Sequence, residues 1–294
     1  MNRTNQIVWG AIGVIVIGGL AGFGGAKIGG GGGSASASAA PLATPYSFLN
    51  QIKSAGKLTV GCATSPPTIN IAGNGACTGS DLIPAQHLAK DLNVKFVTVD
   101  TTWQNIVTGL EAGKYDFAAD LDATGQRALA IQYTSAIWTY PGVFVVPANT
   151  PDRTSAAIFA SGKSISVAAG SAEDLALEAI SPAPPETKLP DWPHAFLALQ
   201  SGRVGSEFTD LGDAEVQVKQ DPQYKIVVPS PSIFVHNVDY GVPATVDPAS
   251  LEAIDIIINN AVAAGKIGRA MSAAGYIAST SDLGSMLLSS SASS

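Results

Sequence analysis

The chain has 294 residues and is acidic, with 23 Asp and Glu against 16 Lys and Arg and a formal net charge of −7. Because a phosphate backbone requires a basic face, this charge and the absence of any Lys/Arg run argue against a nucleic-acid partner. The length suits one large domain or two of ordinary size, so neither a disulfide scaffold nor a metal is needed for folding.

The N-terminal segment is predicted to meet a membrane. Residues 7–26 carry no ionisable side chain and lie between Arg3 and Lys27. As a helix this stretch reaches about 30 Å, the thickness of a bilayer's hydrocarbon core. Residues 1–27 are therefore interpreted as a signal peptide or an uncleaved transmembrane anchor, with the chain after them exported. A buried glycine-rich core helix is a third interpretation. The Gly-, Ser- and Ala-rich stretch 28–45 is expected to be a flexible tether.

The exported part contains two cysteines, Cys62 and Cys77. An oxidising compartment would permit a disulfide between them, which would stabilise the fold by about 3 kcal/mol. Two buried free thiols are the alternative, since the sequence does not show how close the two residues come. The cysteines lack zinc-site spacing, and the three histidines share no metal-ligand spacing. We therefore expect no metal and no cofactor.

Strand and helix patterns alternate through the first part of the body. We expect strands over 58–63, 94–99 and 117–121 and helices over 81–92 and 103–112. This order is typical of βαβ units, which form a mostly parallel sheet with helices on both faces.

The pattern then restarts, which indicates a second α/β unit. The expected strands are 164–168, 204–209 and 224–228, and the expected helices are 172–180, 194–201, 213–220, 248–264 and 266–274. Ser171, followed by Asp174 three residues later, is a capping-box pattern that starts the helix over 172–180.

Extended segments over 139–146 and 234–242 are predicted to cross between two lobes. The expected division is lobe 1 over 46–140 and 239–278, lobe 2 over 141–238, and a flexible tail over 279–294. A ligand would bind between the lobes, where the carboxyl ends of strands meet the amino ends of helices.

Catalytic motifs are incomplete in this sequence. Gly162-Lys163-Ser164 resembles the end of a phosphate-binding loop, but Ala157 replaces the glycine that the loop requires. The S-x-x-K match that begins at Ser54 lacks the partner motifs of its class. The sequence thus gives no positive argument for an enzyme.

Four stretches together carry a family resemblance: 49–63, 103–116, the T-G-Q-R-A motif at 124–128, and 201–210. Residues 46–276 resemble the family 3 extracellular solute-binding proteins, the ligand-capturing subunits of polar amino-acid ABC importers. The resemblance implies a type II periplasmic-binding-protein-like α/β fold with two lobes, each a mostly parallel sheet flanked by helices. It also implies permease subunits as partners, and it includes Thr124 among the ligand-binding residues.

The resemblance assigns roles to further residues. Arg127 matches the position that grips the ligand's α-carboxylate, and a guanidinium fork suits that group; a solvated Arg on a helix face is the alternative. Asp210 matches the acceptor of the α-ammonium, or simply initiates a turn. Gly170 and Ser171 would offer free N–H groups to the carboxylate, or serve only as a helix cap. Trp103 would be an aromatic platform for the ligand, or core packing.

Departures from the family pattern point to the ligand's charge. Thr68 stands where an aromatic residue is common, and Ser65 where Asp is frequent. Asp122 replaces a small hydroxyl residue or a backbone amide, so it would repel a ligand carboxylate and could form an ion pair with Arg127. Strand alternation would point Asp120 the same way as Asp122. We therefore expect a ligand with a positive group.

The sequence is thus interpreted as an exported, periplasmic or cell-surface, solute-binding protein for a polar amino acid or an amine-bearing relative. One alternative is a sensor or accessory ectodomain of the same fold. Another is a cyclohexadienyl dehydratase-like enzyme, in which acids near Arg127 would act as general acid or base.

Overall fold

The computed structural model describes residues 46–151, 154–273 and 276. All of these belong to one compact unit of the chain. The predicted membrane segment 1–27, the tether over 28–45 and the tail over 279–294 lie outside the described residues. Within the described part, none of the helices has the length and apolar character needed to cross a bilayer.

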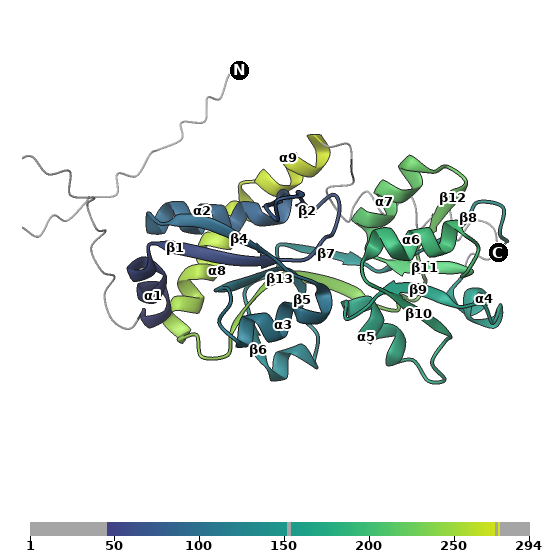
Figure 1. Cartoon of the computed structure of the whole chain (residues 1–294), viewed down its shortest axis with the longest axis horizontal. Helices are drawn as coiled ribbons and strands as arrows, with labels where there is room; N and C mark the ends of the chain where they lie inside the picture. The colour runs from purple at the N-terminus through teal and green to yellow at the C-terminus, as the bar shows by residue number, and fades with distance from the viewer. Residues whose placement is uncertain (1–45, 152–153, 274–275, 277–294) are drawn as a thin grey trace, which may run out of the picture. The chain divides into compact units, whose positions relative to one another are not determined.

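The first sheet has six strands in the order β4-β1-β5-β13-β6, with β7 paired to β13 (Figure 1). Its strands are β1 (Lys57–Cys62), β4 (Lys95–Asp100), β5 (Phe117–Asp122), β6 (Ile131–Tyr133), β7 (Trp138–Pro141) and β13 (Val235–Pro243). β1 runs parallel to β4 and β5, whereas β13 runs antiparallel to β5, β6 and β7.

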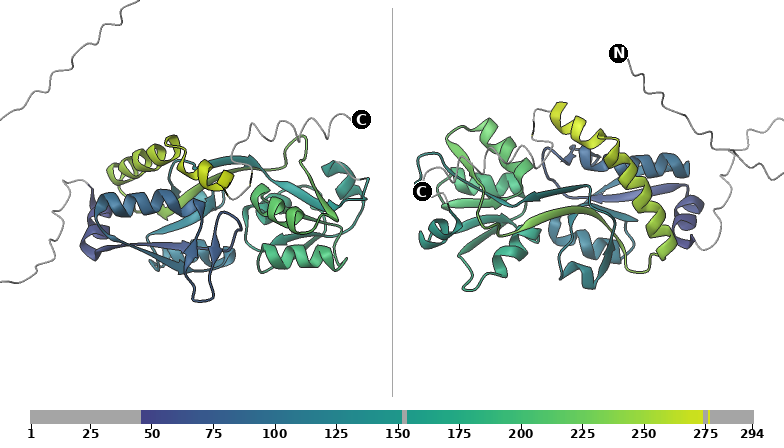
Figure 2. Two further views of the ribbon diagram at one scale, coloured as in Figure 1. Left: turned by 90° about the horizontal axis from the view of Figure 1, so that it is seen from above. Right: turned by 180° about the vertical axis from the view of Figure 1, so that it is seen from behind.

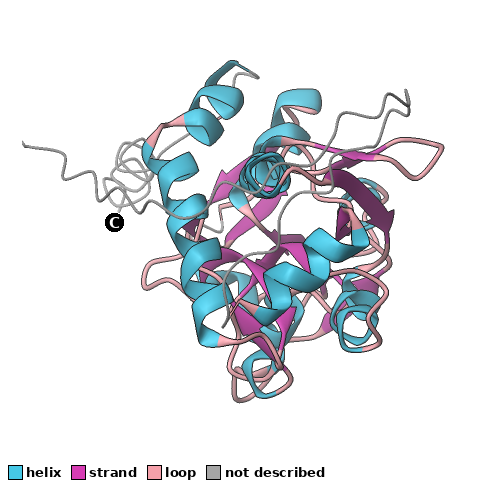
Figure 3. Ribbon diagram, turned by 90° about the vertical axis from the view of Figure 1, so that its left-hand side faces the viewer, coloured by secondary structure: helices cyan, strands magenta, loops and turns pink. Residues whose placement is uncertain are grey.

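Helices cover both faces of this sheet, and sheet and helices together form what we call the first lobe (Figure 3). The helices are α1 (Ser47–Ala55), α2 (Ile83–Leu92), α3 (Trp103–Glu111), α8 (Pro248–Ala263) and α9 (Lys266–Ala273). Leu49, Leu88 and Ile254 place α1, α2 and α8 in one buried cluster with Phe117. The α3 helix contributes Ile106 to a second cluster.

The second sheet has the order β10-β9-β11-β8-β12 and, with its helices, forms the second lobe (Figure 1). Its strands are β8 (Val143–Pro147), β9 (Ile165–Ala168), β10 (Glu186–Leu189), β11 (Ser206–Thr209) and β12 (Tyr224–Val227), and its helices are α4 (Ser155–Ala160), α5 (Ala172–Glu178), α6 (Trp192–Gln200) and α7 (Leu211–Gln220). The two-lobed α/β fold that the sequence predicts is confirmed. The sheets are mixed rather than mostly parallel, because β8 and β13 enter antiparallel to their neighbours.

The chain passes between the lobes twice, from β7 into β8 and from β12 back into β13 (Figure 2). β13 pairs with β7 from Val235 onward, so the expected lobe boundary after residue 238 falls inside this strand. The second sheet is thus one continuous stretch of chain, whereas the first is assembled from segments on both sides of it.

Three helix starts differ from the sequence prediction: a proline explains the start of α2, and side-chain caps explain the starts of α6 and α7. Pro84 lies in the first turn of α2, and the preceding residues form a 3-10 turn, η1 (Ser80–Leu82). Asp191 caps α6 and Asp210 caps α7, so both helices begin two residues earlier than expected. The predicted Ser171 cap of α5 is present, with its hydroxyl accepting from the Asp174 amide at 3.2 Å.

A small hairpin adds two strands that the sequence analysis does not predict. It consists of β2 (Asn70–Ile71) and β3 (Cys77–Thr78). Cys62, at the end of β1, forms a disulfide with Cys77, and their Cα atoms lie 6.6 Å apart. The bridge ties the hairpin to the first sheet close to where the lobes meet.

Candidate functional site

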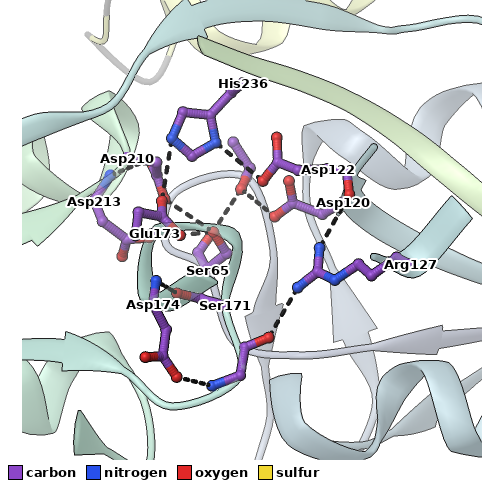
Figure 4. Close-up of polar contacts among 12 residues, drawn as sticks. Ser65, Asp120, Asp122, Arg127, Ser171, Glu173, Asp174, Asp210, Asp213 and His236 are labelled. Atoms are coloured by element: carbon purple, nitrogen blue, oxygen red, sulfur yellow. Dashed lines mark hydrogen bonds and ion pairs between the residues drawn. The ribbon is translucent and has the colours of Figure 1, made fainter. Parts of the chain in front are cut away.

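A small cavity lies between the two lobes, and Figure 4 shows polar side chains around it. Its volume is about 10 Å³, counted as the space open to the centre of a water molecule. It is lined by residues of both lobes, Ser65, Trp103, Asp120, Asp122, Arg127, Tyr140, Ser171, Ala172, Glu173, Trp192, Asp210 and His236. The lobes therefore stand closed on one another around a polar, highly charged centre.

Arg127 reaches into this centre from η2 (Arg127–Leu129) and contacts both lobes (Figure 4). One terminal nitrogen, Nη1, donates to the Asp122 carbonyl at 3.0 Å, and the other, Nη2, donates to the Gly170 carbonyl at 2.8 Å. Its backbone N–H donates to the Thr124 hydroxyl at 3.2 Å, which fixes the turn. Arg127 is only 6% exposed, so it is not a solvated surface residue.

The anticipated ion pair between Arg127 and Asp122 does not form, because the Asp122 carboxylate turns to His236 and only its carbonyl faces Arg127. A guanidinium carries five N–H donors. Its two hydrogen bonds within the described residues go to neutral carbonyls. The positive charge of Arg127 thus remains available to an anionic group.

Gly170 and Ser171 form the turn ahead of α5, but their N–H groups are not free. The Gly170 N–H donates to the Asp174 carboxylate at 2.8 Å, and the Ser171 N–H donates to the Ala168 carbonyl at 3.1 Å. Gly170 also has a positive φ of 77°, and a Cβ built on it would lie 2.9 Å from the Gln104 Cα of the first lobe. The turn therefore contributes close approach of the lobes and a carbonyl for Arg127.

Asp210 caps a helix and also lines the cavity. Its Oδ1 accepts the Asp213 amide at 2.9 Å as the cap of α7, and the residue also lines the cavity. The Ser65 hydroxyl of the first lobe lies 3.1 Å from Asp213 Oδ2 and 3.4 Å from Asp210 Oδ2. Burial raises the pKa of both carboxyl groups.

Asp120 and Asp122 both line the cavity, but strand alternation is not the reason. Asp120 has a φ of +55°, and the pairing of β5 with β13 slips beside Tyr240. Burial, followed by the charges of Asp81, Asp210 and Asp122, raises the pKa of Asp120 well above its usual value. Its Oδ2 lies 3.1 Å from the Thr68 hydroxyl, which also contacts the Ser65 carbonyl at 2.7 Å. Since a hydroxyl has one hydrogen, a protonated Asp120 that donates to Thr68 satisfies both contacts.

His236 is a central residue that the sequence analysis missed (Figure 4). It is 1% exposed; its Nδ1 lies 3.0 Å from Asp122 Oδ2, and its Nε2 lies 3.1 Å from Glu173 Oε1. Burial alone lowers the pKa of His236, but the two carboxylates outweigh burial and raise that pKa well above its usual value. No spacing rule identifies this group, because its partners lie far away in the chain.

Two tryptophans, one from each lobe, line the cavity. Trp103 is the first residue of α3 and Trp192 the first of α6. Both are buried, and neither indole N–H has an acceptor among the described residues. Trp103 packs in the core and lines the cavity, so its two interpretations are compatible. Trp192 and Tyr140 were missed, although Trp192 repeats the helix-start placement of Trp103.

Thr68, Thr124 and Gly170 do not line the cavity themselves, and each instead bonds a residue that does. Among the residues that the structure describes, His, Cys, Asp and Glu form no group of three placed to hold a metal ion.

Known proteins of similar sequence bind amino acids, as their names state. The chain is 24% identical over 179 residues to ABC transporter arginine-binding protein 1 of Escherichia coli (strain K12), a match that spans 60% of this chain and 72% of that protein. It is 23% identical over 181 residues to the probable histidine-binding protein of Campylobacter jejuni subsp. jejuni serotype O:2 (strain ATCC 700819 / NCTC 11168), covering 61% and 70% of the two chains.

Among solved structures, the fold resembles that of the ancestral amino acid-binding protein AncCDT-1, a precursor of cyclohexadienyl dehydratase. The TM-score is 0.66 with 23% identity, and the match covers 76% of this chain and 97% of the other. The profile of the bacterial extracellular solute-binding proteins, family 3, matches residues 58–272. This match spans most of the chain and both lobes, and the chain therefore belongs to the family 3 bacterial extracellular solute-binding proteins.

Proposed function

We propose that this protein captures a basic amino acid, or an amine-bearing relative, between its lobes and delivers it to an ABC importer. Family membership and a relative named as an arginine-binding protein support amino-acid transport. The observation that carries the choice of ligand is the convergence of four carboxylates, those of Asp120, Asp122, Glu173 and Asp210, on one buried cavity. A buried carboxyl group ionises readily only beside a cation, so the cleft favours a positively charged ligand.

Arg127 and Asp210 are proposed to hold the amino-acid head group. The guanidinium would bind the α-carboxylate through the N–H groups not directed at carbonyls, and charge-assisted bonds of this kind are strong when buried. Asp210, fixed by capping α7, would accept the α-ammonium. Asp120, from the opposite lobe, would then meet a positive group at the far end of the ligand side chain.

Ligand entry requires the lobes to separate. A cavity of about 10 Å³ has room for a single water molecule, far less than an amino acid occupies. The two crossings, from β7 to β8 and from β12 to β13, are the natural place for a hinge. The closed arrangement described here is thus one end of the proposed motion.

Calorimetry with arginine, ornithine, citrulline, glutamate and a polyamine tests the ligand class. We expect arginine or ornithine to bind most tightly. Arg127→Lys retains the charge but loses the planar fork, so it should weaken amino-acid binding by about tenfold or more. Tighter binding of glutamate than of every cation would reject the proposal. As a control, Arg203→Lys changes an Arg of the second lobe that does not line the cavity.

We propose that the protein binds its ligand without chemical turnover. The enzyme alternative is tested by incubating the protein with prephenate and arogenate and following both by chromatography. Unchanged substrate is the expected result, whereas dehydration of either compound would favour a dehydratase. Arginine-dependent stimulation of the ATPase of a reconstituted importer would support delivery, and its absence with every amino-acid importer of the host would favour a sensor.

Export and attachment to the membrane are proposed from the apolar stretch 7–26. Mass spectrometry of the mature protein separates a cleaved signal peptide from a retained anchor. A mature chain that begins within the tether over 28–45 supports cleavage, and a full-length chain in the membrane fraction supports anchoring.

A further inference from the structure

The imidazole of His236 occupies the position that a bound cation would take between two carboxylates. Asp122 reaches it from β5 and Glu173 from α5, at 3.0 and 3.1 Å from the two ring nitrogens. Tyr140 and Phe234 pack on the ring, with centroids at 4.9 and 4.7 Å. These contacts hold the ring in a fixed position against both lobes.

This arrangement changes the charge that the cleft presents to a ligand. Four carboxylates line the cavity, and Asp122 and Glu173 are both engaged by His236. Asp120 and Asp210, together with Arg127, make no ion pair among the described residues. The carboxylates left for a ligand are thus one from each lobe, matching the two positive groups of a basic amino acid.

We propose that His236 is a specificity-determining residue, a built-in cation that neutralises Asp122 and Glu173 and so limits how strongly the cleft prefers a charged ligand over a neutral one. This inference rests on the proposed function, because it concerns the selectivity of the same cleft.

The charge state of His236 depends on all the titratable groups around it. These are Asp120 and Asp122 from β5, Arg127 from η2, Tyr140 from β7, Glu173 from α5 and Asp210 ahead of α7. Carboxylates outnumber the single other cation, so the imidazole retains its proton at neutral pH. Long-range proton–nitrogen NMR of the ligand-free protein tests this directly, with His236→Gln used to assign the signal. A neutral ring at neutral pH would overturn the inference.

Selectivity is tested by the ratio of the dissociation constants of citrulline and arginine, two amino acids of nearly the same shape that differ in side-chain charge. Removing a positive charge close to the ligand should strengthen its preference for a cation. We therefore expect His236→Gln to raise the citrulline-to-arginine ratio by about tenfold, and His236→Lys, which restores a positive charge, to return it toward the wild-type value.

A purely structural role for His236 predicts a different result. The substitution would then weaken the binding of citrulline and arginine by the same factor and leave the ratio of their dissociation constants unchanged. That outcome would overturn the inference while leaving the proposed function intact. Failure of the wild-type protein to bind any of the basic amino acids or the polyamine would reject the proposed function, and the selectivity role with it. His194→Gln is the matched control, because the His194 side chain is 58% exposed and pairs only with Asp191 among the described residues; its ratio should equal that of wild type.

Discussion

At the scale of single residues, the backbone of Asp120 is the clearest departure from regular structure. A φ of +55° lies in the left-handed region, which Gly occupies freely, Asn and Asp tolerate and Ala resists. Ala119 and Asp120 together oppose Tyr240 of β13, so the strand carries a bulge there. The bulge directs the carboxylate toward Thr68 and the cavity.

Three substitutions at Asp120 separate the cost of its backbone from the cost of its charge. Asp120→Gly removes the backbone cost and the charge cost, whereas Asp120→Asn removes the charge cost only. We expect each of these two variants to have a free energy of unfolding about 1 kcal/mol higher than wild type at alkaline pH. Asp120→Ala retains the left-handed conformation and should be about 1 kcal/mol less stable than the Gly variant. Urea denaturation of the ligand-free protein measures all three, and equal stability of the Ala and Gly variants would contradict the described backbone.

Residues were predictable from sequence where a local motif marks them. Arg127 and Asp210 follow from short family-like patterns, and both line the cavity. His236 and Glu173 were not predictable, because their roles arise from contacts between segments 63 or more positions apart. The left-handed conformation of Asp120 also escaped prediction, since it depends on the register of β13 and not on the sequence around Asp120.

At the scale of elements, the turn between β9 and α5 controls how closely the lobes meet. A Cβ added at Gly170 would lie 2.9 Å from the Gln104 Cα, whereas one added at Gly162, which has a similar positive φ of 65°, would meet nothing within 4 Å. Ala at either position should destabilise the fold by about 1 kcal/mol. Only Gly170→Ala should also weaken ligand binding, because its methyl group obstructs closure.

Denaturation and calorimetry on both glycine variants check this prediction. Gly162→Ala serves as the matched control, with the same backbone cost and no contact between lobes. Equal ligand affinity in the two variants would show that closure does not bring Gly170 against Gln104.

The β2–β3 hairpin depends on its disulfide, because two strands of two residues bury little surface of their own. Cys62 and Cys77 are separated by 15 positions. Reduction should therefore lower the free energy of unfolding by about 3 kcal/mol. Guanidinium denaturation with and without dithiothreitol measures the loss, and a double Cys→Ala variant should not respond to the reductant. A wild-type curve unaffected by reduction would contradict a stabilising bridge.

Elements were predictable where hydrophobic periodicity is long, as in β1, α3 and α8. The sequence analysis misplaced three helix starts, because the Asp191 and Asp210 caps and Pro84 were not weighed as start signals. It also missed the hairpin, whose strands are too short to show alternation. The antiparallel orientation of β8 and β13 was missed, because a hydrophobic pattern does not show in which direction a strand runs relative to its neighbours.

At the scale of the whole molecule, buried acids govern how stability responds to pH. Burial raises the pKa of Asp81 to about 6 and that of Asp239 to about 7, and it raises the pKa of Asp120, Asp213 and Glu207 as well. A carboxyl whose folded-state pKa is raised stabilises the fold below its unfolded pKa, and this contribution is lost as pH rises through the folded pKa. His236 acts with the same sign.

We therefore expect the ligand-free protein to be more stable at about pH 5.5 than at about pH 8, the reverse of the usual behaviour of paired carboxylates. Chemical denaturation over a series of pH values measures the trend. Saturating arginine should reduce the trend, because a bound cation compensates the ionised acids that line the cavity. Stability that rises with pH over this range would show that the buried acids are ionised at little cost.

The position of β13 inside the first sheet also bears on how the polypeptide folds. This strand pairs with β5, β6 and β7, yet it follows the entire second sheet in the chain. The second lobe can therefore reach its native topology from one uninterrupted segment, while the first must wait for distant residues to return. Amide protection in a refolding experiment should accordingly arise in β9 and β11 before it arises in β5.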